Sequence, residues 1–184
     1  MPFITTNIPG LLVFEPNILP DSRGYFYESY NEKEFADLGI NIRFVQDNES
    51  SSLYGVVRGL HYQLTPYAQA KLMRVLEGRI LDIAVDIRRG SPSFGKFFSI
   101  ELTAENKKQL FIPSGFAHGF SVLSKKAVVL YKCSDFYNKE SEAGIRFDDL
   151  QLGIDWQIPA DKAIISDKDR SLPLLANCRN NFDF

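Results

Sequence analysis

Residues 80–87 read Ile80-Leu81-Asp82-Ile83-Ala84-Val85-Asp86-Ile87, and their alternation of side chains decides the fold class. Successive side chains of a β-strand point to opposite faces of a sheet. One face of this stretch carries Leu81, Ile83, Val85 and Ile87, and the other carries Asp82 and Asp86. The pattern predicts a half-buried β-strand.

Further β-rich runs follow and precede this strand. They lie at residues 11–15, 25–30, 55–63, 71–76, 97–102, 109–112, 119–123 and 128–133. Turns rich in Gly and Pro, such as Gly90-Ser91-Pro92, separate several of them. Helical patterning is confined to residues 32–38 and a stretch around 171–178. The spacing predicts a mainly β sandwich or barrel with short peripheral helices, and residues 1–184 are expected to form a single domain.

The composition argues against several classes of partner. The 184 residues include 21 basic and 23 acidic side chains, for a formal net charge of −2. Without a basic field, neither nucleic acid nor an acidic membrane surface is an expected partner. No apolar run approaches the ~20 residues that a membrane helix needs. Two cysteines without C-x-x-C spacing, and a beginning unlike a signal peptide, indicate a cytoplasmic protein.

One stretch matches part of a metal-binding pattern. Pro113-Ser114-Gly115-Phe116-Ala117-His118 has the form of the second cupin box, P-x-G-x-x-H. The first cupin box should carry two histidines, but the corresponding stretch here is His61-Tyr62-Gln63. A first-row metal normally takes three or four protein ligands, and the chain has only two histidines. The sequence therefore predicts a cupin-like barrel without a metal.

His61 is a candidate general base. Histidine has an ordinary pKa of about 6.5, so its neutral form can take a proton from a carbon beside a carbonyl at neutral pH. Arg58 and Lys71 are cations that can bind an anionic substrate or stabilise an enolate. On an ideal pleat His61 and Gln63 share one face and Arg58 lies on the other, so a bend at Gly59 is needed to bring Arg58 and His61 to one cavity. A purely structural role for His61 stays open at this point.

Seven longer motifs follow one another along the chain. They are Arg23-Gly24-Tyr25-Phe26-Tyr27-Glu28, Gln46-Asp47-Asn48, Val57-Arg58-Gly59-Leu60-His61-Tyr62-Gln63, Ala68-Gln69-Ala70-Lys71-Leu72, Asp86-Ile87-Arg88-Arg89-Gly90-Ser91-Pro92, Ile112-Pro113-Ser114-Gly115-Phe116-Ala117-His118-Gly119-Phe120 and Tyr131-Lys132-Cys133-Ser134-Asp135. In order and spacing they resemble the dTDP-4-dehydrorhamnose 3,5-epimerase family. The resemblance implies a cupin-like double-stranded β-helix, or jelly-roll barrel, that needs no metal or cofactor and usually forms a homodimer. It also implies inversion of carbons 3 and 5 of dTDP-4-dehydro-6-deoxy-D-glucose, on the route to L-rhamnose.

The resemblance assigns a role to each candidate catalytic residue. It makes His61 the general base and the acidic residue after Lys168, Asp169, the partner that orients it, with Asp167 as the alternative. A carboxylate bonded to one ring nitrogen fixes the tautomer and leaves the other nitrogen free. Tyr131 is expected to deliver a proton from the opposite face, and Lys71 is expected beside the C4 oxygen.

The resemblance also implies a set of substrate-binding residues. Arg23 and Arg58 resemble the diphosphate-binding arginines, a role that suits the planar guanidinium. Tyr137 is expected to cover the substrate sugar; many family members have a second tyrosine where this chain has Phe136. The remaining members of the predicted binding set are Glu28, Gln46, Asp47, Asn48, His118, Glu142 and Lys168.

Three alternative functions remain open on sequence grounds. Relatives with the same scaffold epimerise only C3 or C5 of a related dTDP-4-keto-6-deoxy sugar, or move its ketone. A non-catalytic sugar-binding cupin could keep the barrel and the arginines, but it would not need His61, Lys71, Tyr131 and Asp169 together. A metal-dependent cupin dioxygenase or isomerase is disfavoured by Gln63, which stands where a ligand histidine is expected.

Overall fold

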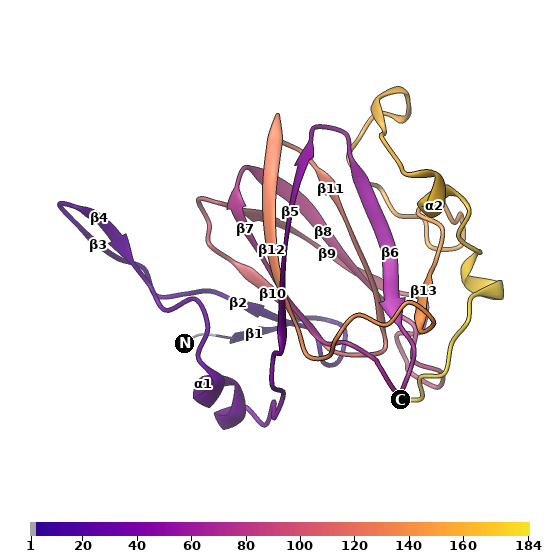
Figure 1. The fold of residues 1–184 in the computed structure, drawn as a ribbon, viewed down its shortest axis with the longest axis horizontal. Helices are drawn as coiled ribbons and strands as arrows, with labels where there is room; N and C mark the ends of the chain where they lie inside the picture. The colour runs from indigo at the N-terminus through magenta and orange to yellow at the C-terminus, as the bar shows by residue number, and fades with distance from the viewer. Residues whose placement is uncertain (1–2) are drawn as a thin grey trace.

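The computed structural model describes residues 3–184, which form two facing antiparallel sheets and a separate hairpin (Figure 1). The strands of the six-stranded sheet are, in spatial order, β1 (Phe3–Thr5), β2 (Leu12–Phe14), β10 (Gln109–Ile112), β7 (Lys71–Glu77), β12 (Lys126–Cys133) and β5 (Gln46–Leu53). Those of the five-stranded sheet are β13 (Glu142–Gly144), β6 (Val57–Gln63), β11 (Phe116–Val122), β8 (Arg79–Asp86) and β9 (Phe97–Thr103). Neighbouring strands are mostly distant in sequence, as in a jelly roll. The predicted mainly β barrel is confirmed.

Short elements lie outside the two sheets. β3 (Leu19–Asp21) and β4 (Gly24–Phe26) form a hairpin that projects far from the barrel in Figure 1, and only its second strand coincides with part of the run predicted at 25–30. α1 (Glu32–Asp37) confirms the helix predicted near residues 32–38. None of the helices in residues 3–184 is long and apolar enough to span a membrane.

The helix predicted around residues 171–178 is wrong in its position. The α-helical turn α2 (Asp167–Arg170) comes before it, and only the 3-10 helix η2 (Leu175–Asn177) lies within it. Pro173 separates the two, and proline lacks the N–H that a continuing helix would need. A second 3-10 helix, η1 (Ala160–Lys162), lies between β13 and α2.

β8 is present as predicted, but it is buried on both faces rather than half-buried. Its apolar face packs against the C-terminal segment, where Ile83 lies in one cluster with Trp156 and Phe182. Its other face points into the barrel, where Ala84 joins a core built from both sheets. The two acidic residues of that inner face, Asp82 and Asp86, have no exposed surface. Alternation predicts which residues share a face but not whether a second layer covers that face.

β5 has no apolar pattern and does not appear among the predicted strands. It is an edge strand, paired over its eight residues with β12 alone. An edge strand that is half open to solvent tolerates polar residues on both faces. The less exposed side carries Gln46, Asn48 and Ser50, which line the barrel interior.

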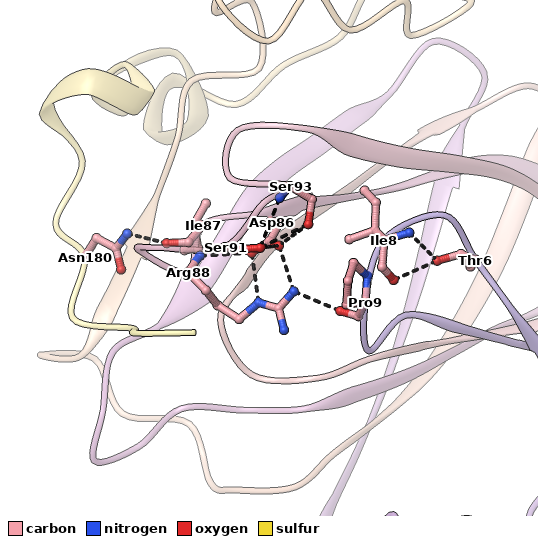
Figure 2. A network of polar contacts seen from close by, with 9 residues as sticks. All are labelled: Thr6, Ile8, Pro9, Asp86, Ile87, Arg88, Ser91, Ser93 and Asn180. Carbon is pink, nitrogen blue, oxygen red and sulfur yellow. Dashed lines mark hydrogen bonds and ion pairs between the residues drawn. The ribbon is translucent and has the colours of Figure 1, made fainter.

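A buried carboxylate ties the end of β8 to the surrounding loops (Figure 2). Asp86 accepts two hydrogen bonds from the Arg88 guanidinium, at 2.9 and 2.7 Å, and one from each hydroxyl of Ser91 and Ser93, at 2.6 and 2.7 Å. Arg88 also donates to the carbonyl of Pro9 at 2.8 Å. Burial alone would raise the pKa of Asp86, but these hydrogen bonds together hold it below the ordinary value of 3.8. The network therefore joins the end of β8, the loop that follows it and the segment around Pro9, and its bonds to the carboxylate favour the ionised form of Asp86.

We expect Asp86→Asn to lower the free energy of unfolding by about 3 kcal/mol at pH 7, because it leaves the largely buried Arg88 without its carboxylate. The depressed pKa means that this stabilisation is complete above pH 3.8 and is lost as the pH falls through the lower folded-state value. Urea unfolding of both proteins at pH 7 and pH 3 measures the difference. A gap between wild type and variant that stays constant down to pH 3 would contradict the assignment.

Candidate active site

Two adjoining cavities open between the sheets. One, of about 170 Å³, is lined by side chains of β5, β6, β7, β12 and β13, and the other, of about 120 Å³, extends toward β11. Both are lined by His61, Lys71 and Tyr131. His61 comes from the five-stranded sheet, whereas Lys71 and Tyr131 come from the six-stranded sheet. The predicted base and the predicted acid therefore face one cavity from opposite walls.

A bulge in β6 brings Arg58 and His61 to one face. From Phe120 to His118 on β11 is a step of two residues, but the paired residues on β6, Arg58 and His61, are three apart. The extra residue reverses the alternation, so both side chains line the same cavity. Gly59 permits it, because its φ is +128° and a Cβ there would lie 2.6 Å from the β11 backbone. The bend that the sequence required at Gly59 is confirmed.

Asp169 holds His61 from behind. His61 Nε2 lies 2.8 Å from Asp169 Oδ1, and the other carboxylate oxygen accepts the N–H of Gly59 at 3.2 Å. The Ser166 hydroxyl accepts the N–H of Asp169 at 3.1 Å and caps α2. Burial would raise the pKa of Asp169, but its hydrogen bonds, foremost that with His61, lower it below the usual range. Asp167, the alternative partner, lies exposed on α2.

Lys71 and Tyr131 have altered acidity on the opposite wall. Burial raises the pKa of Tyr131, and the neighbouring Cys133 adds to the effect, so the phenol keeps its proton at neutral pH. Burial lowers the pKa of Lys71, whereas Cys133, Asp82 and Glu142 favour its charged form. A phenol that keeps its proton suits a proton donor, and a lysine in the same wall of the cavity suits a partner for an oxyanion.

A second histidine–carboxylate pair lies deeper in the barrel. His118 Nε2 is 2.8 Å from Asp82 Oδ1, and both side chains are almost fully buried. Burial lowers the pKa of His118, although Asp82 opposes this, so the imidazole stays neutral. Asp82 was not among the predicted site residues; its signal in the sequence was an acidic residue inside an otherwise apolar strand. Its second oxygen has no hydrogen-bond partner within residues 3–184.

The rim of the cavity carries a chain of polar contacts. The Tyr137 hydroxyl donates to Glu142 at 3.1 Å, and Lys168 Nζ lies 2.5 Å from the other oxygen of the same carboxylate. Gln46 donates to the Asn48 side-chain oxygen at 3.1 Å, and Asn48 contacts Cys133 Sγ at 3.5 Å. All of these predicted binding residues except Lys168 line the larger cavity, and Lys168 lines a groove beside His61.

The structure does not bring three of the predicted residues to the cavity. Arg23 lies at the turn of the projecting hairpin, 87% exposed, and pairs with Asp21 at 2.6 Å. Glu28 accepts from Asn31 at 2.9 Å. Asp47 lies on the outer face of β5, where its carboxylate contacts Lys132 at 3.0 Å. Arg23, Glu28 and Asp47 therefore lie outside both cavities of this chain.

The side-chain donors do not assemble into a metal site. Across residues 3–184 there is no cluster of three or more His, Cys, Asp or Glu side chains suited to hold an ion. Each histidine has a carboxylate partner of its own, and the Gln63 side chain is bonded to backbone groups of Tyr67, Phe136 and Asn138. Proton transfer between amino-acid side chains is the chemistry that these groups support.

Comparison with known proteins decides the family. The family model for dTDP-4-dehydrorhamnose 3,5-epimerase matches residues 5–177. The chain belongs to the dTDP-4-dehydrorhamnose 3,5-epimerase family. The family member from Shigella flexneri is 52% identical over 170 residues, which cover 92% of this chain and 93% of that protein.

Solved structures of epimerases in this family agree with the fold. The dTDP-4-dehydrorhamnose 3,5-epimerase of Elizabethkingia anophelis NUHP1 has a TM-score of 0.94 at 53% identity and covers 96% of this chain and 97% of its own. The 3,5-epimerase of Legionella pneumophila Philadelphia 1, solved with dTDP-4-keto-L-rhamnose, has a TM-score of 0.92 at 50% identity, with coverage of 96% and 93%. The cupin-like barrel of this epimerase family is therefore the fold of this chain.

For a member of this epimerase family, the contact between His61 and Asp169 carries a direct expectation. Asp169→Asn should lower kcat/KM on the order of 10²-fold, because an amide no longer fixes the imidazole tautomer or stabilises its protonated form. Asp167→Asn, on the exposed side of the same helix, is the matched control and should retain wild-type activity. Steady-state rates of both variants test the choice, and a greater loss in Asp167→Asn would reverse it.

Proposed function

We propose that this protein is an epimerase that inverts C3 and C5 of dTDP-4-dehydro-6-deoxy-D-glucose, giving dTDP-4-dehydro-L-rhamnose for L-rhamnose synthesis. The observation that carries the proposal is the placement of His61 and Tyr131 on opposite walls of one cavity. Inversion needs a base on one face of the carbon and an acid on the other. The family match over residues 5–177 supports the assignment to this whole chain as one domain.

The first half of each inversion removes a proton. Asp169 engages Nε2 of His61, which leaves Nδ1 to take the proton from the carbon beside the C4 ketone. The electron pair of the broken C–H bond moves into an enolate, and negative charge develops on the C4 oxygen. Lys71 lines the same cavity, and its ammonium group stabilises that charge.

The second half returns a proton to the opposite face. The phenol of Tyr131 gives its proton to the carbon as the enolate collapses back to the ketone. C3 and C5 both flank C4, so the same groups serve each carbon in turn if the sugar ring turns between steps. Exchange of the two groups' protons with water restores the starting state.

The nucleotide end is assigned to polar groups around the same opening. Arg58, whose Nε–H donates to the Ser52 hydroxyl at 3.0 Å, is assigned to the diphosphate, because a planar guanidinium suits phosphate oxygens. Gln46 and Asn48 support binding of the thymine and sugar, with His118, Glu142 and Lys168 around them. Tyr137 at the rim covers the sugar.

Proton NMR of dTDP-4-dehydro-6-deoxyglucose with the enzyme in heavy water tests the function. Deuterium should enter both C3 and C5 of dTDP-4-dehydro-L-rhamnose. Exchange at one carbon only would make the protein a single-site epimerase, and migration of the ketone would make it a ketoisomerase. Binding of the dTDP-sugar without any deuterium exchange would indicate a non-catalytic sugar-binding protein.

We also propose that the protein is a cytoplasmic homodimer in which the projecting hairpin reaches the partner subunit. Its strands are exposed throughout, and Phe26 is 69% exposed. Such a surface is typical of a region that another chain covers. Arg23 and Glu28 would then serve the neighbouring site, which explains why neither reaches the cavity of its own chain. The free thiols of Cys133 and Cys178 suit a reducing compartment.

Mixed dimers test whether Arg23 acts across the interface. Arg23→Ala and His61→Ala subunits, each nearly inactive alone, should regain about a quarter of wild-type activity when unfolded and refolded together, because half of the dimers are hybrids with one complete site. The measured quantity is epimerisation by the equimolar mixture. If mass spectrometry shows that hybrids are present and activity does not recover, Arg23 acts in the site of its own subunit. A fully active monomer in sedimentation experiments would contradict the proposed dimer.

A further inference from the structure

The loop between β12 and β13 is held by one buried side chain. Gln63, 5% exposed on β6, donates from Nε2 to the carbonyl of Phe136 at 3.2 Å and accepts the N–H of Asn138 at 2.7 Å. These two residues flank Tyr137, which lies at the rim of the cavity. The same amide donates to the carbonyl of Tyr67 at 2.7 Å, in the loop after β6. Gln63 thus joins two rim loops and brackets Tyr137 on both sides.

Two further glutamines reinforce the same loop with one bond each. Gln46 accepts the N–H of Tyr137 at 3.2 Å, and Gln69 donates to the carbonyl of Asp135 at 2.7 Å. Four consecutive residues of the loop, 135–138, are therefore bound through their backbone to side chains from other segments. Loops rarely receive this density of outside hydrogen bonds, since most of their backbone groups face water.

The strand pairing places the other anchor of Tyr137 beside Gln63. Glu142 on β13 is the cross-strand partner of Gln63, and it accepts the Tyr137 hydroxyl at 3.1 Å. Gln63 therefore binds the backbone on both sides of Tyr137, and Glu142, which pairs with Gln63 across the strands, binds the Tyr137 hydroxyl. Because both amide hydrogens of Gln63 are already donated, the side chain has no donor left for a substrate.

We infer that Gln63 is a positioning residue that clamps the Tyr137 loop over the sugar end of the cavity and acts on the reaction only through Tyr137. The inference rests on the proposed function, in which Tyr137 covers the sugar. A fixed cover holds the sugar through two successive inversions, whereas a loose cover lets the singly inverted intermediate leave after one. Such a clamp affects substrate binding and the number of inversions during one binding event, but not the proton transfer itself.

Gln63→Met tests the clamp, because methionine has nearly the same shape but makes none of the three hydrogen bonds. We expect kcat/KM to fall on the order of 10- to 10²-fold, mainly through KM. In heavy water a larger share of released product should carry deuterium at one carbon only. The amide hydrogens of Tyr137 and Asn138 should exchange faster with solvent. Gln63→Glu, which keeps the acceptor for Asn138 but loses both donated bonds, is the second variant if the first does not fold.

A matched control separates clamping from general stability. Asn180 also makes two side-chain bonds to backbone: it donates to the carbonyl of Ile87 (Figure 2) and accepts from the N–H of Phe182. It does not line either cavity. Asn180→Leu should lower the melting temperature and leave KM and the deuterium pattern unchanged. A Gln63 variant that behaves in the same way would show a purely structural role and overturn the inference.

A double-mutant cycle tests whether the effect passes through Tyr137. Adding the Gln63 change to Tyr137→Ala should raise KM by less than twofold, since the cover is already lost. An undiminished effect in the Tyr137→Ala background would overturn the inference. Failure of the proposed function is distinct: wild type would then show no exchange at C3 or C5. In that case faster amide exchange at 137 and 138, with weaker binding of the dTDP-sugar, still supports the clamp, and unchanged values reject it.

Discussion

His61→Ala is expected to lower the rate of proton exchange at C3 and C5 on the order of 10²- to 10⁴-fold, because it removes the base from both inversions. Binding should change little, since the imidazole acts mainly in the transition state. The carboxylate of Asp169 then remains beside an empty space, but it is engaged by the N–H of Gly59 and lies behind the position of the lost ring. From that position Asp169 cannot take over the role of the base.

Three measurements on the His61 variant define the result. Deuterium incorporation followed by NMR gives the exchange rate, and calorimetry with dTDP gives the affinity for the nucleotide. Exchange at nearly the wild-type rate would remove His61 from the mechanism. Loss of nucleotide binding together with exchange would indicate a disturbed cavity rather than a missing base, and the melting temperature of the variant identifies that case.

Tyr131→Phe is expected to suppress formation of the doubly inverted product strongly while His61-dependent exchange persists. The substitution removes only the phenolic hydroxyl and keeps the ring that packs against the barrel core. His61 can still take a proton and return a deuteron to the same face, which exchanges the carbon without inverting it. Without the phenol as proton donor, inversion should fall on the order of 10²-fold or more.

Exchange and inversion at each carbon are measured separately. Product analysis after reduction of the C4 ketone measures inversion, and NMR of the recovered substrate measures exchange. Tyr30→Phe is the matched control, because burial also raises the pKa of Tyr30 but that ring packs outside the cavity against Phe35 and Phe44. Wild-type inversion in Tyr131→Phe would require another proton donor on the six-stranded wall.

Local patterns predicted much of the fold. Strand alternation predicts β8 and most of the inner strands, because successive side chains of a strand point to opposite faces of the sheet. Alternation does not indicate the edge strand β5, because a strand half open to solvent has no apolar face. The C-terminal α-helical turn lies at Asp167–Arg170, a few residues before the predicted stretch. The apolar pattern of that stretch continues across Pro173, where a helix cannot.

The sequence by itself determined the family, most of the inner strands of the barrel and most of the candidate groups, because motifs and alternation are properties of neighbouring residues. Only the tertiary structure decided their geometry. Asp169 meets His61 across 108 positions, the bulge at Gly59 turns Arg58 to the same cavity, and the inner face of β8 buries Asp82 against His118. Arg23 and Glu28 stay outside that cavity on the projecting hairpin and its flank. The reason is physical: a strand's own sequence sets which side chains share a face, but packing between distant segments sets what that face meets.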